Sequence, residues 1–246
     1  MYKEYFEGKK AIFFDLDGTV IDSLPLWERA YTKVAESLGN GDVNLTPIHT
    51  GSTTSEIWKI LLGDYDFEYK IPIPDLVTQT KKEYLNALNE YPLEVMEGFW
   101  SLIHDLKEKL KLKVVLISNS DRDIVNKILE KLNLNDIFDF TICGDEVKNR
   151  KPNPEIYNVA ASKMGLNYTD VLVFEDSISG VTSSTKAHMD TIVILGEVIS
   201  PNMYPKSVLT FLSNFEPLIG NLELTYEQHI KKAAEDPEIA EYTNPD

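Results

Sequence analysis

The sequence predicts an α/β protein in which a parallel sheet lies between two layers of helices and a helical domain is inserted into the chain. Short apolar runs alternate with longer helical patterns, which is typical of a parallel sheet. The runs at residues 114–117 and 171–174 are apolar at every position, as expected of strands covered on both faces. About 100 residues separate the first run from the second, far more than one crossover needs. These features predict a three-layer, Rossmann-like core with an inserted all-helical cap domain.

The predicted elements follow one another in the order that such a core requires. The first strand covers residues 11–14 and ends directly before the first of two aspartates. Helical patterns then fall within the long gap, at residues 26–38, 55–62 and 76–88. Later strands are predicted at residues 113–117, 140–143, 171–174 and 191–195, and a further helix begins near Pro154.

The inserted domain is expected to begin near Asp22 and to end near Pro92. A proline discourages helical structure in the residue before it, so the helical pattern is expected to stop there. We therefore assign residues 1–21 and 93–222 to the core domain and residues 22–92 to the helical cap. Residues 223–246 are predicted to form an acidic tail, one helix with a frayed end, to which no function is assigned.

Charge and composition exclude several classes of partner. The chain of 246 residues has a formal net charge of −16, and its lysines and arginines are scattered among more numerous acids. Nucleic acid and anionic membranes both require basic patches, so we expect neither as a partner. The single cysteine, Cys143, cannot form an internal disulfide, and no apolar run reaches the roughly 20 residues of a membrane-spanning helix. Without a signal-peptide pattern, we predict a globular cytoplasmic protein, a monomer or a weak homodimer.

Polar residues follow three of the predicted strands, at the edge where open α/β sheets bind ligands. They are Asp15, Asp17 and Thr19, then Ser118, Asn119 and Ser120, and finally Glu175, Asp176 and Ser177. Lys151 lies shortly before the helix at Pro154. If the strands are neighbours, four acids, a hydroxyl, an amide and an ammonium group converge on one rim. Crowded carboxylates raise one another's pKa unless a cation lies between them, and an oxygen-rich site with few ligands suits Mg²⁺.

Taken singly, these motifs have ordinary explanations. Asp15-x-Asp17 also resembles the start of a calcium loop, but such a loop requires glycine at its sixth place and glutamate at its twelfth. This chain has Val20 and Leu26 there. A lone Lys151 fits a surface lysine, and a lone Ser-Asn-Ser fits a turn or a helix cap. Only the ordered set is specific.

The ordered set resembles the motifs of the haloacid dehalogenase superfamily, in the branch with a helical cap after the first strand, which includes phosphatases and β-phosphoglucomutase. The matching segments are DLDGT at residues 15–19, SNS at 118–120, RKPNPEIY at 150–157 and FEDSISG at 174–180. Together they span about 170 residues, and their joint occurrence in this order is far more specific than a single match.

The resemblance implies a role for each matching residue. It implies that Asp15 attacks the substrate phosphorus and forms an aspartyl phosphate, which water then hydrolyses. Asp17 is expected to protonate the leaving oxygen, to deprotonate the water later, and to give its main-chain carbonyl to the metal. Asp15 and Asp176 are expected to bind Mg²⁺ directly, with Glu175 acting through a water or a hydrogen bond. The groups expected to hold the phosphate oxygens are Ser118, Asn119, Lys151 and the backbone N–H groups after Asp15, beginning at Leu16.

The resemblance favours a phosphatase over a mutase. In β-phosphoglucomutase a cap histidine stands twelve residues after the motif aspartate, and counting from Asp15 that position here is Trp27. The mutase also has an arginine three residues after a glycine of its cap loop, and counting from Gly51 that position here is Thr54. We therefore predict Mg²⁺-dependent hydrolysis of a small phosphate monoester such as a sugar phosphate, because a mutase must exclude water during transfer. Three alternatives stay open: a mutase with a relocated proton shuttle, a catalytically silent phosphate-binding regulator, and a partner-binding protein that uses its acidic surface.

Two further features concern the cap loop and a turn of the core. The segment HTGSTTSEIW at residues 49–58 contains His49 and several hydroxyl residues. It either binds sugar hydroxyls or only caps a helix through Thr53 or Thr54. His188 stands where relatives usually have a glycine, and we expect it to affect only the turn from a helix to the next strand.

Overall fold

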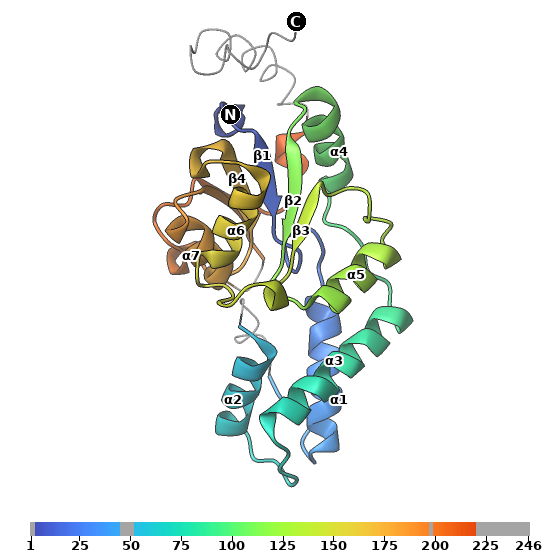
Figure 1. Ribbon diagram of the computed structural model, residues 1–246. Helices are drawn as coiled ribbons and strands as arrows, with labels where there is room; N and C mark the ends of the chain where they lie inside the picture. The colour runs from blue at the N-terminus through green and yellow to red at the C-terminus, as the bar shows by residue number, and fades with distance from the viewer. Residues whose placement is uncertain (1–2, 45–51, 197–198, 220–246) are drawn as a thin grey trace, which may run out of the picture.

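The computed structural model describes residues 3–44, 52–196 and 199–219, and within them a parallel sheet of six strands has the order β3-β2-β1-β4-β5-β6 (Figure 1). The strands are β1 (Ala11–Phe14), β2 (Lys113–Ile117), β3 (Phe140–Ile142), β4 (Val171–Glu175), β5 (Asp190–Ile194) and β6 (Thr210–Leu212). β1 pairs with β2 and with β4, so Phe14 lies opposite both Leu116 and Phe174. The polar residues that follow these three strands therefore begin at the same edge of the sheet.

Helices cover both faces of the sheet, which confirms the predicted three-layer core. One face carries α4 (Phe99–His104), which continues as a π-helical turn η2 (Asp105–Lys109), and α5 (Arg122–Lys131); the other carries α6 (Glu155–Met164) and α7 (Ile178–Lys186) (Figure 1). The 3₁₀ turns are η1 (Lys3–Phe6), η3 (Gly144–Glu146), η4 (Tyr168–Asp170), η5 (Pro201–Met203) and η6 (Glu216–Leu218).

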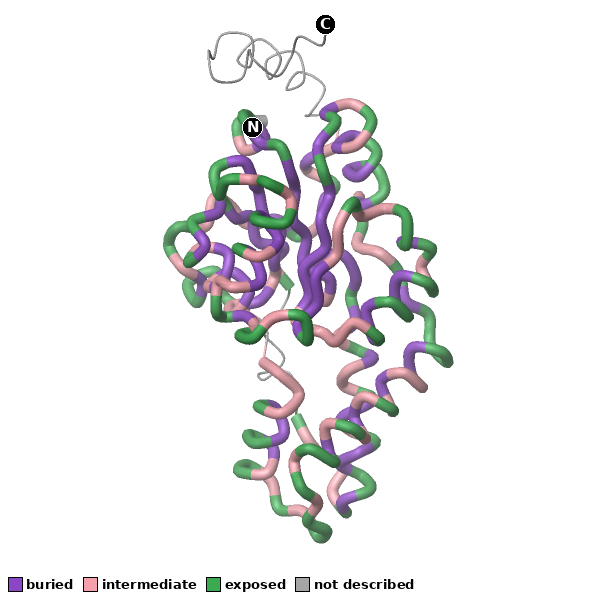
Figure 2. The backbone as a smooth tube through the Cα atoms, in the orientation of Figure 1, coloured by how far each residue is buried: buried purple, intermediate pink, exposed green. Residues whose placement is uncertain are grey.

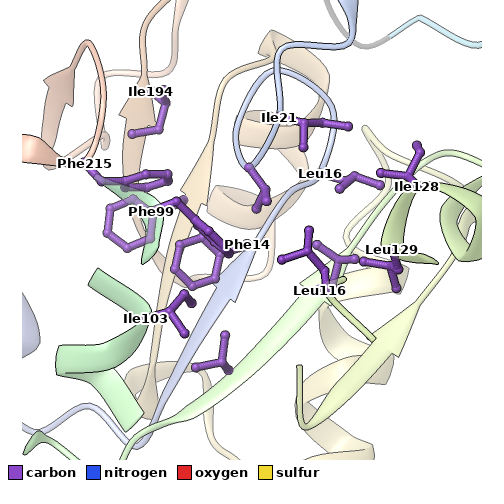
Figure 3. Packing of buried hydrophobic residues seen from close by; sticks show 14 of the residues in the cluster. Phe14, Leu16, Ile21, Phe99, Ile103, Leu116, Ile128, Leu129, Ile194 and Phe215 are labelled. Carbon is purple, nitrogen blue, oxygen red and sulfur yellow. The ribbon is translucent and has the colours of Figure 1, made fainter. Parts of the chain in front are cut away.

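Every residue of β1 is buried (Figure 2). Its side chains alternate between the two faces, because Ile12 and Phe14 belong to one hydrophobic cluster and Ala11 and Phe13 to the other. Phe14 points into the cluster formed with α4 and α5, where its ring meets Phe99 and Phe215 edge to face at 5.9 and 5.8 Å (Figure 3). Phe13 points into the other cluster, which contains Tyr157 of α6. This alternation is the physical reason that β1 has no polar residue until Asp15, where the strand has ended.

The three helices of the inserted segment pack beside the edge at which β1 ends. They are α1 (Leu24–Ser37), α2 (Thr54–Asp64) and α3 (Ile73–Glu90) (Figure 1). They share a buried cluster of their own, which includes Tyr31 and Trp58. A capping box starts α2: Thr53 Oγ1 accepts from the N–H of Glu56, and Glu56 Oε2 accepts from the N–H of Thr53. The cap borders at residues 22 and 92 stay a prediction.

The structure differs from the sequence expectation in one strand and in some ends. β6 was not predicted, because three residues at the edge of a sheet give too short a pattern to recognise. The strand predicted at 140–143 stops at Ile142, and the strand predicted at 191–195 begins at Asp190 and stops at Ile194. His188 has a φ of 61° between α7 and β5, which confirms its place in the turn.

Some expectations fall on other parts of the chain. His49, Gly51 and the tail at 223–246 lie outside the described residues. Within the ranges that the structure describes, no helix combines the length and apolar character needed to cross a membrane.

Candidate active site

Carboxylates from two neighbouring strands meet at the carboxyl edge of the sheet. Asp15 follows β1 directly, Glu175 is the last residue of β4, and Asp176 comes next. One carboxylate oxygen of each lies within 4.8 Å of those of the other two. Asp15 is 6% exposed and Glu175 0%, whereas Asp176 is partly exposed. The structure thus brings three of the four predicted acids into one cluster, because β1 and β4 are adjacent.

Lys151 enters this cluster from the loop before α6. Its Nζ lies 2.5 Å from Asp15 Oδ1, 2.6 Å from Glu175 Oε1 and 3.0 Å from the carbonyl oxygen of Ile117. These three acceptors match the three protons of an ammonium group. The side chain is 2% exposed, so Lys151 is not a surface lysine. Burial alone would lower the pKa of Lys151, but the charges of Asp15 and Glu175 raise it above its ordinary value.

Glu175 is held on both of its oxygens. Besides Lys151, Oε1 accepts from the hydroxyl of Tyr157 at 2.9 Å. Oε2 accepts from the N–H groups of Asp176 and Ser177, at 3.1 and 3.2 Å, and from the Ser177 hydroxyl at 3.1 Å. A Cβ at Gly180 would lie 1.7 Å from Oε1, so the first turn of α7 also closes on this carboxylate. Glu175 therefore orients Lys151 and the loop to α7.

Asp17 is not a member of the carboxylate cluster and is bound by three side-chain donors. The Ser23 hydroxyl donates to Oδ1 at 2.5 Å, and the Ser120 hydroxyl donates to Oδ2 at 2.9 Å. The indole Nε1 of Trp27, in α1, lies 3.4 Å from Oδ1. The two aspartates of the first motif thus have different surroundings: Asp15 faces an ammonium group, and Asp17 faces neutral donors.

The Ser-Asn-Ser segment after β2 is tied to the lysine loop. The side-chain oxygen of Asn119 accepts from the N–H of Lys151 at 3.0 Å, and its Nδ2 donates to the Lys151 carbonyl at 3.3 Å. Ser118 is 1% exposed, and its Oγ accepts from the N–H of Ser120 at 3.0 Å. Asn119 therefore holds the backbone from which Lys151 projects. Contacts of Ser118, Asn119 and Lys151 with a phosphate stay predictions.

Leu16 and Asp176 differ in what they can offer the site. The Leu16 side chain is fully buried in the core, so a contact of its main-chain N–H with a phosphate stays a prediction. Asp176 Oδ1 accepts from the Thr19 hydroxyl at 3.3 Å, and the Asp176 carbonyl accepts from the Tyr204 hydroxyl at 2.5 Å. The first bond joins the loop after β1 to the loop after β4, and the second ties the segment after η5 to the same loop.

The donor set fits a hard divalent cation such as Mg²⁺. Burial raises the pKa of Asp15 well above its ordinary value; Lys151 opposes this rise, and the nearby carboxylates add to it. Burial and the charge of Glu175 also raise the pKa of Asp176. A bound cation reverses such shifts, because it stabilises the ionised carboxylates. Oδ2 of Asp15 and Oδ2 of Asp176 remain for an ion, whereas the oxygens of Glu175 are already hydrogen bonded.

The fold and this edge cluster together define a class of α/β enzymes that place an aspartate pair directly after the first strand of a parallel sheet. The family model of the haloacid dehalogenase-like hydrolases matches residues 12–194, and the chain belongs to that family.

Three relatives show the range of the similarity. The chain is 31% identical over 184 residues to a phosphorylated carbohydrates phosphatase of Thermotoga maritima. The aligned region covers 74% of this chain and 83% of that protein. It is 26% identical over 198 residues to the fructose-1-phosphate phosphatase YqaB of Escherichia coli K12, covering 78% of this chain and 97% of the relative. The crystal structure of CbbY from Rhodobacter sphaeroides in complex with phosphate superposes with a TM-score of 0.75 at 21% identity, covering 85% of this chain and 96% of that one.

Sequence reasoning missed several side chains that hold the site. Tyr157, Ser23 and Tyr204 contact Glu175, Asp17 and Asp176, respectively. Tyr157 lies within the matched segment RKPNPEIY, which is the one signal that pointed to it. Ser23 and Tyr204 carry no such signal, because their contacts depend on how the chain returns to the sheet.

Proposed function

We propose that this protein hydrolyses a small phosphate monoester, a phosphorylated carbohydrate, through an aspartyl phosphate on Asp15. The observation that carries the proposal is the different environment of the two neighbouring aspartates. Asp15 lies 2.5 Å from the buried ammonium group of Lys151, whereas Asp17 is bound by three neutral donors. The names of the two curated relatives, both phosphatases of phosphorylated sugars, support the same substrate class.

In the first step, a carboxylate oxygen of Asp15 forms a bond to phosphorus while the bond from phosphorus to the sugar oxygen breaks. Asp17 gives its proton to that leaving oxygen. In the second step, water attacks the phosphorus, Asp17 takes the proton of the water, and the carboxylate of Asp15 is released with inorganic phosphate. Each group returns to its starting state, as catalysis requires.

The remaining residues bind and orient the transferring phosphoryl group. Ser118 and the main-chain N–H groups of Leu16 and Asp17 would donate to its nonbridging oxygens, and Lys151 would do so by exchanging one of its present acceptors for the phosphoryl group. Asn119 keeps the Lys151 loop in place. Bound between Asp15 and Asp176, Mg²⁺ would neutralise charge so that an anionic carboxylate and an anionic phosphate can approach. The main-chain carbonyl of Asp17 is proposed as a further ligand of that ion.

The residue at position 27 favours hydrolysis over mutation. The indole N–H of Trp27 can donate a hydrogen bond to Asp17, but it cannot shuttle protons, because it does not titrate in the physiological range. A cytoplasmic location and a monomer or weak homodimer stay predictions.

The test is a phosphate-release screen over sugar phosphates, phosphoglycolate and nucleotides, with and without Mg²⁺. We expect Mg²⁺-dependent release, lost by about three orders of magnitude or more in Asp15→Asn, since the nucleophile is then absent. The matched control is Asp64→Asn at the exposed end of α2, which should keep wild-type activity. Brief incubation with the substrate should leave the protein phosphorylated, and hydroxylamine should release this phosphate because it cleaves acyl phosphates.

Three other outcomes would contradict the proposal. Conversion of β-glucose 1-phosphate to glucose 6-phosphate without phosphate release would identify a mutase. Phosphate binding without turnover would identify a regulator. Release that survives in Asp15→Asn would place the nucleophile elsewhere.

A further inference from the structure

Trp27 is an indole donor that reaches the acid/base aspartate from the inserted helices. Its Nε1 lies 3.4 Å from Asp17 Oδ1, the oxygen that also accepts from Ser23. Asp17 belongs to the loop after β1, and Trp27 lies in α1, the first helix of the inserted segment. The indole therefore joins the cap to one of the two reacting carboxyl groups.

The position of the Trp27 ring is set by packing on both sides. It stacks on the ring of Tyr84, in α3, with centroids 3.9 Å apart and an interplanar angle of 22°. Tyr84 is fully buried, so the stacked pair is held within the packed interior. Trp27 also packs against two separate clusters, that of the sheet and that of the inserted helices. A shift of α1 or α3 would therefore move the indole N–H relative to Asp17.

We propose that Trp27 is a positioning residue that holds the Asp17 carboxyl in place to protonate the leaving oxygen. An indole can only donate, so it orients Oδ1 without competing for the proton that Asp17 must deliver. Ser23 and Ser120 each hold one oxygen, and the indole adds the contact that depends on the placement of the helices over the sheet. The inference rests on the proposed function, because it assigns Trp27 to the first step of that reaction.

The role of Asp17 as an acid provides a specific readout. An alkyl phosphate such as a sugar phosphate has a poor leaving group and needs the proton, whereas p-nitrophenyl phosphate leaves as a stable phenolate and needs it much less. The value of kcat/KM reports on the steps up to formation of the aspartyl phosphate. The ratio of kcat/KM for the sugar phosphate to that for p-nitrophenyl phosphate therefore measures leaving-group protonation.

The experiment compares Trp27→Phe with the matched variant Trp58→Phe. Trp58 is also an indole donor of the inserted helices, but its Nε1 donates to Thr80 at 2.8 Å, within the helical cluster. We expect Trp27→Phe to lower the ratio about tenfold, a fraction of what a general acid contributes, and Trp58→Phe to leave it unchanged. Trp27→His, which restores a ring N–H, should recover part of the ratio if the donor matters.

The outcomes separate this inference from the proposed function. If the wild type is active and Trp27→Phe leaves the ratio of the two kcat/KM values unchanged, the role of Trp27 is overturned and the proposed function stands. Equal losses of kcat/KM with both substrates leave this ratio unchanged and have the same meaning. The same conclusion follows if the ratio is lower in Trp27→His than in Trp27→Phe, since the size of the ring would then decide the effect. A wild type that releases phosphate from neither substrate would overturn the proposed function and this inference with it. Thermal unfolding of each variant confirms that the chain is folded.

Discussion

Gly18 and Asp176 approach so closely that no side chain fits between them. A Cβ at position 18 would lie 2.2 Å from Asp176 Oδ2, and the φ of Gly18 is +87°, which side-chain-bearing residues rarely adopt. Gly18 thus lets the loop after β1 turn back against the loop after β4. The hydrogen bond from Thr19 to Asp176 Oδ1, at 3.3 Å, depends on the same approach.

Gly18→Ala is therefore expected to abolish most of the activity. The new methyl group would displace the Asp176 carboxylate, one of the proposed ion ligands, and we expect at least about a hundredfold loss in kcat and a higher Mg²⁺ requirement. The matched control is Gly165→Ala, also at positive φ (67°) but with nothing within 4 Å of the added Cβ. That variant should lose only about 1 kcal/mol of stability and keep its activity. Equal activity in the two variants would contradict the prediction.

Removal of the Tyr157 hydroxyl should cost stability more than catalysis. Tyr157 donates to the fully buried Glu175, which keeps Lys151 and three other donors after the hydroxyl is lost. We expect Tyr157→Phe to lower the free energy of unfolding by about 1–2 kcal/mol, with kcat reduced only a few fold. Tyr168→Phe, at a residue that is 53% exposed, is the control and should change neither the stability nor kcat. Chemical denaturation of both variants measures the difference.

Loss of the Lys151 charge should be costly in both stability and activity. Lys151→Met would leave Asp15 and Glu175 buried without their cation, and breaking such a pair costs about 3–5 kcal/mol. Activity should fall below detection, because the phosphoryl oxygens lose their main cationic donor. Lys127→Met, at an exposed position in α5, should be neutral in both measurements. An active, stable Lys151→Met protein would disprove the assigned role.

The stabilising effect of Mg²⁺ should grow with pH. The pKa of Asp15 and that of Asp176 are raised above the ordinary value of 3.8, so without metal the folded state keeps protons that the unfolded chain has lost. The stability that these groups contribute is therefore complete below pH 3.8 and falls as the pH rises toward their folded pKa values. Mg²⁺ binds the ionised carboxylates and removes this penalty.

Melting temperatures measured with EDTA and with Mg²⁺ test this at about pH 5 and about pH 8. The gain from Mg²⁺ should be larger at the higher pH, and Asp176→Asn should abolish most of it. A gain that is the same at both pH values would show that these carboxylates are not the ligands.

The sequence predicted the parts of the fold and site that depend on local pattern and strand order. The fully apolar runs of β2 and β4 predicted a sheet covered on both faces, and Asp15, Lys151, Glu175 and Asp176 do meet at its edge. What it did not predict depends on contacts between distant segments. β6 is a short edge strand with little pattern of its own, and the bonds of Tyr157 to Glu175 and of Trp27 to Asp17 follow from helix packing.

The strand order also has a consequence for synthesis of the chain. β1 and Asp15, which follows it, leave the ribosome before the other strands, but Lys151 follows Asp15 by 136 positions and β4 comes later still. At ordinary rates of translation, more than about five seconds separate the synthesis of Asp15 from that of its partners. A nascent or truncated chain that ends before β4 therefore holds both motif aspartates but has no assembled site. The carboxylate cluster is complete only when β4 pairs with β1, so an unfinished chain lacks the arrangement on which the proposed activity depends.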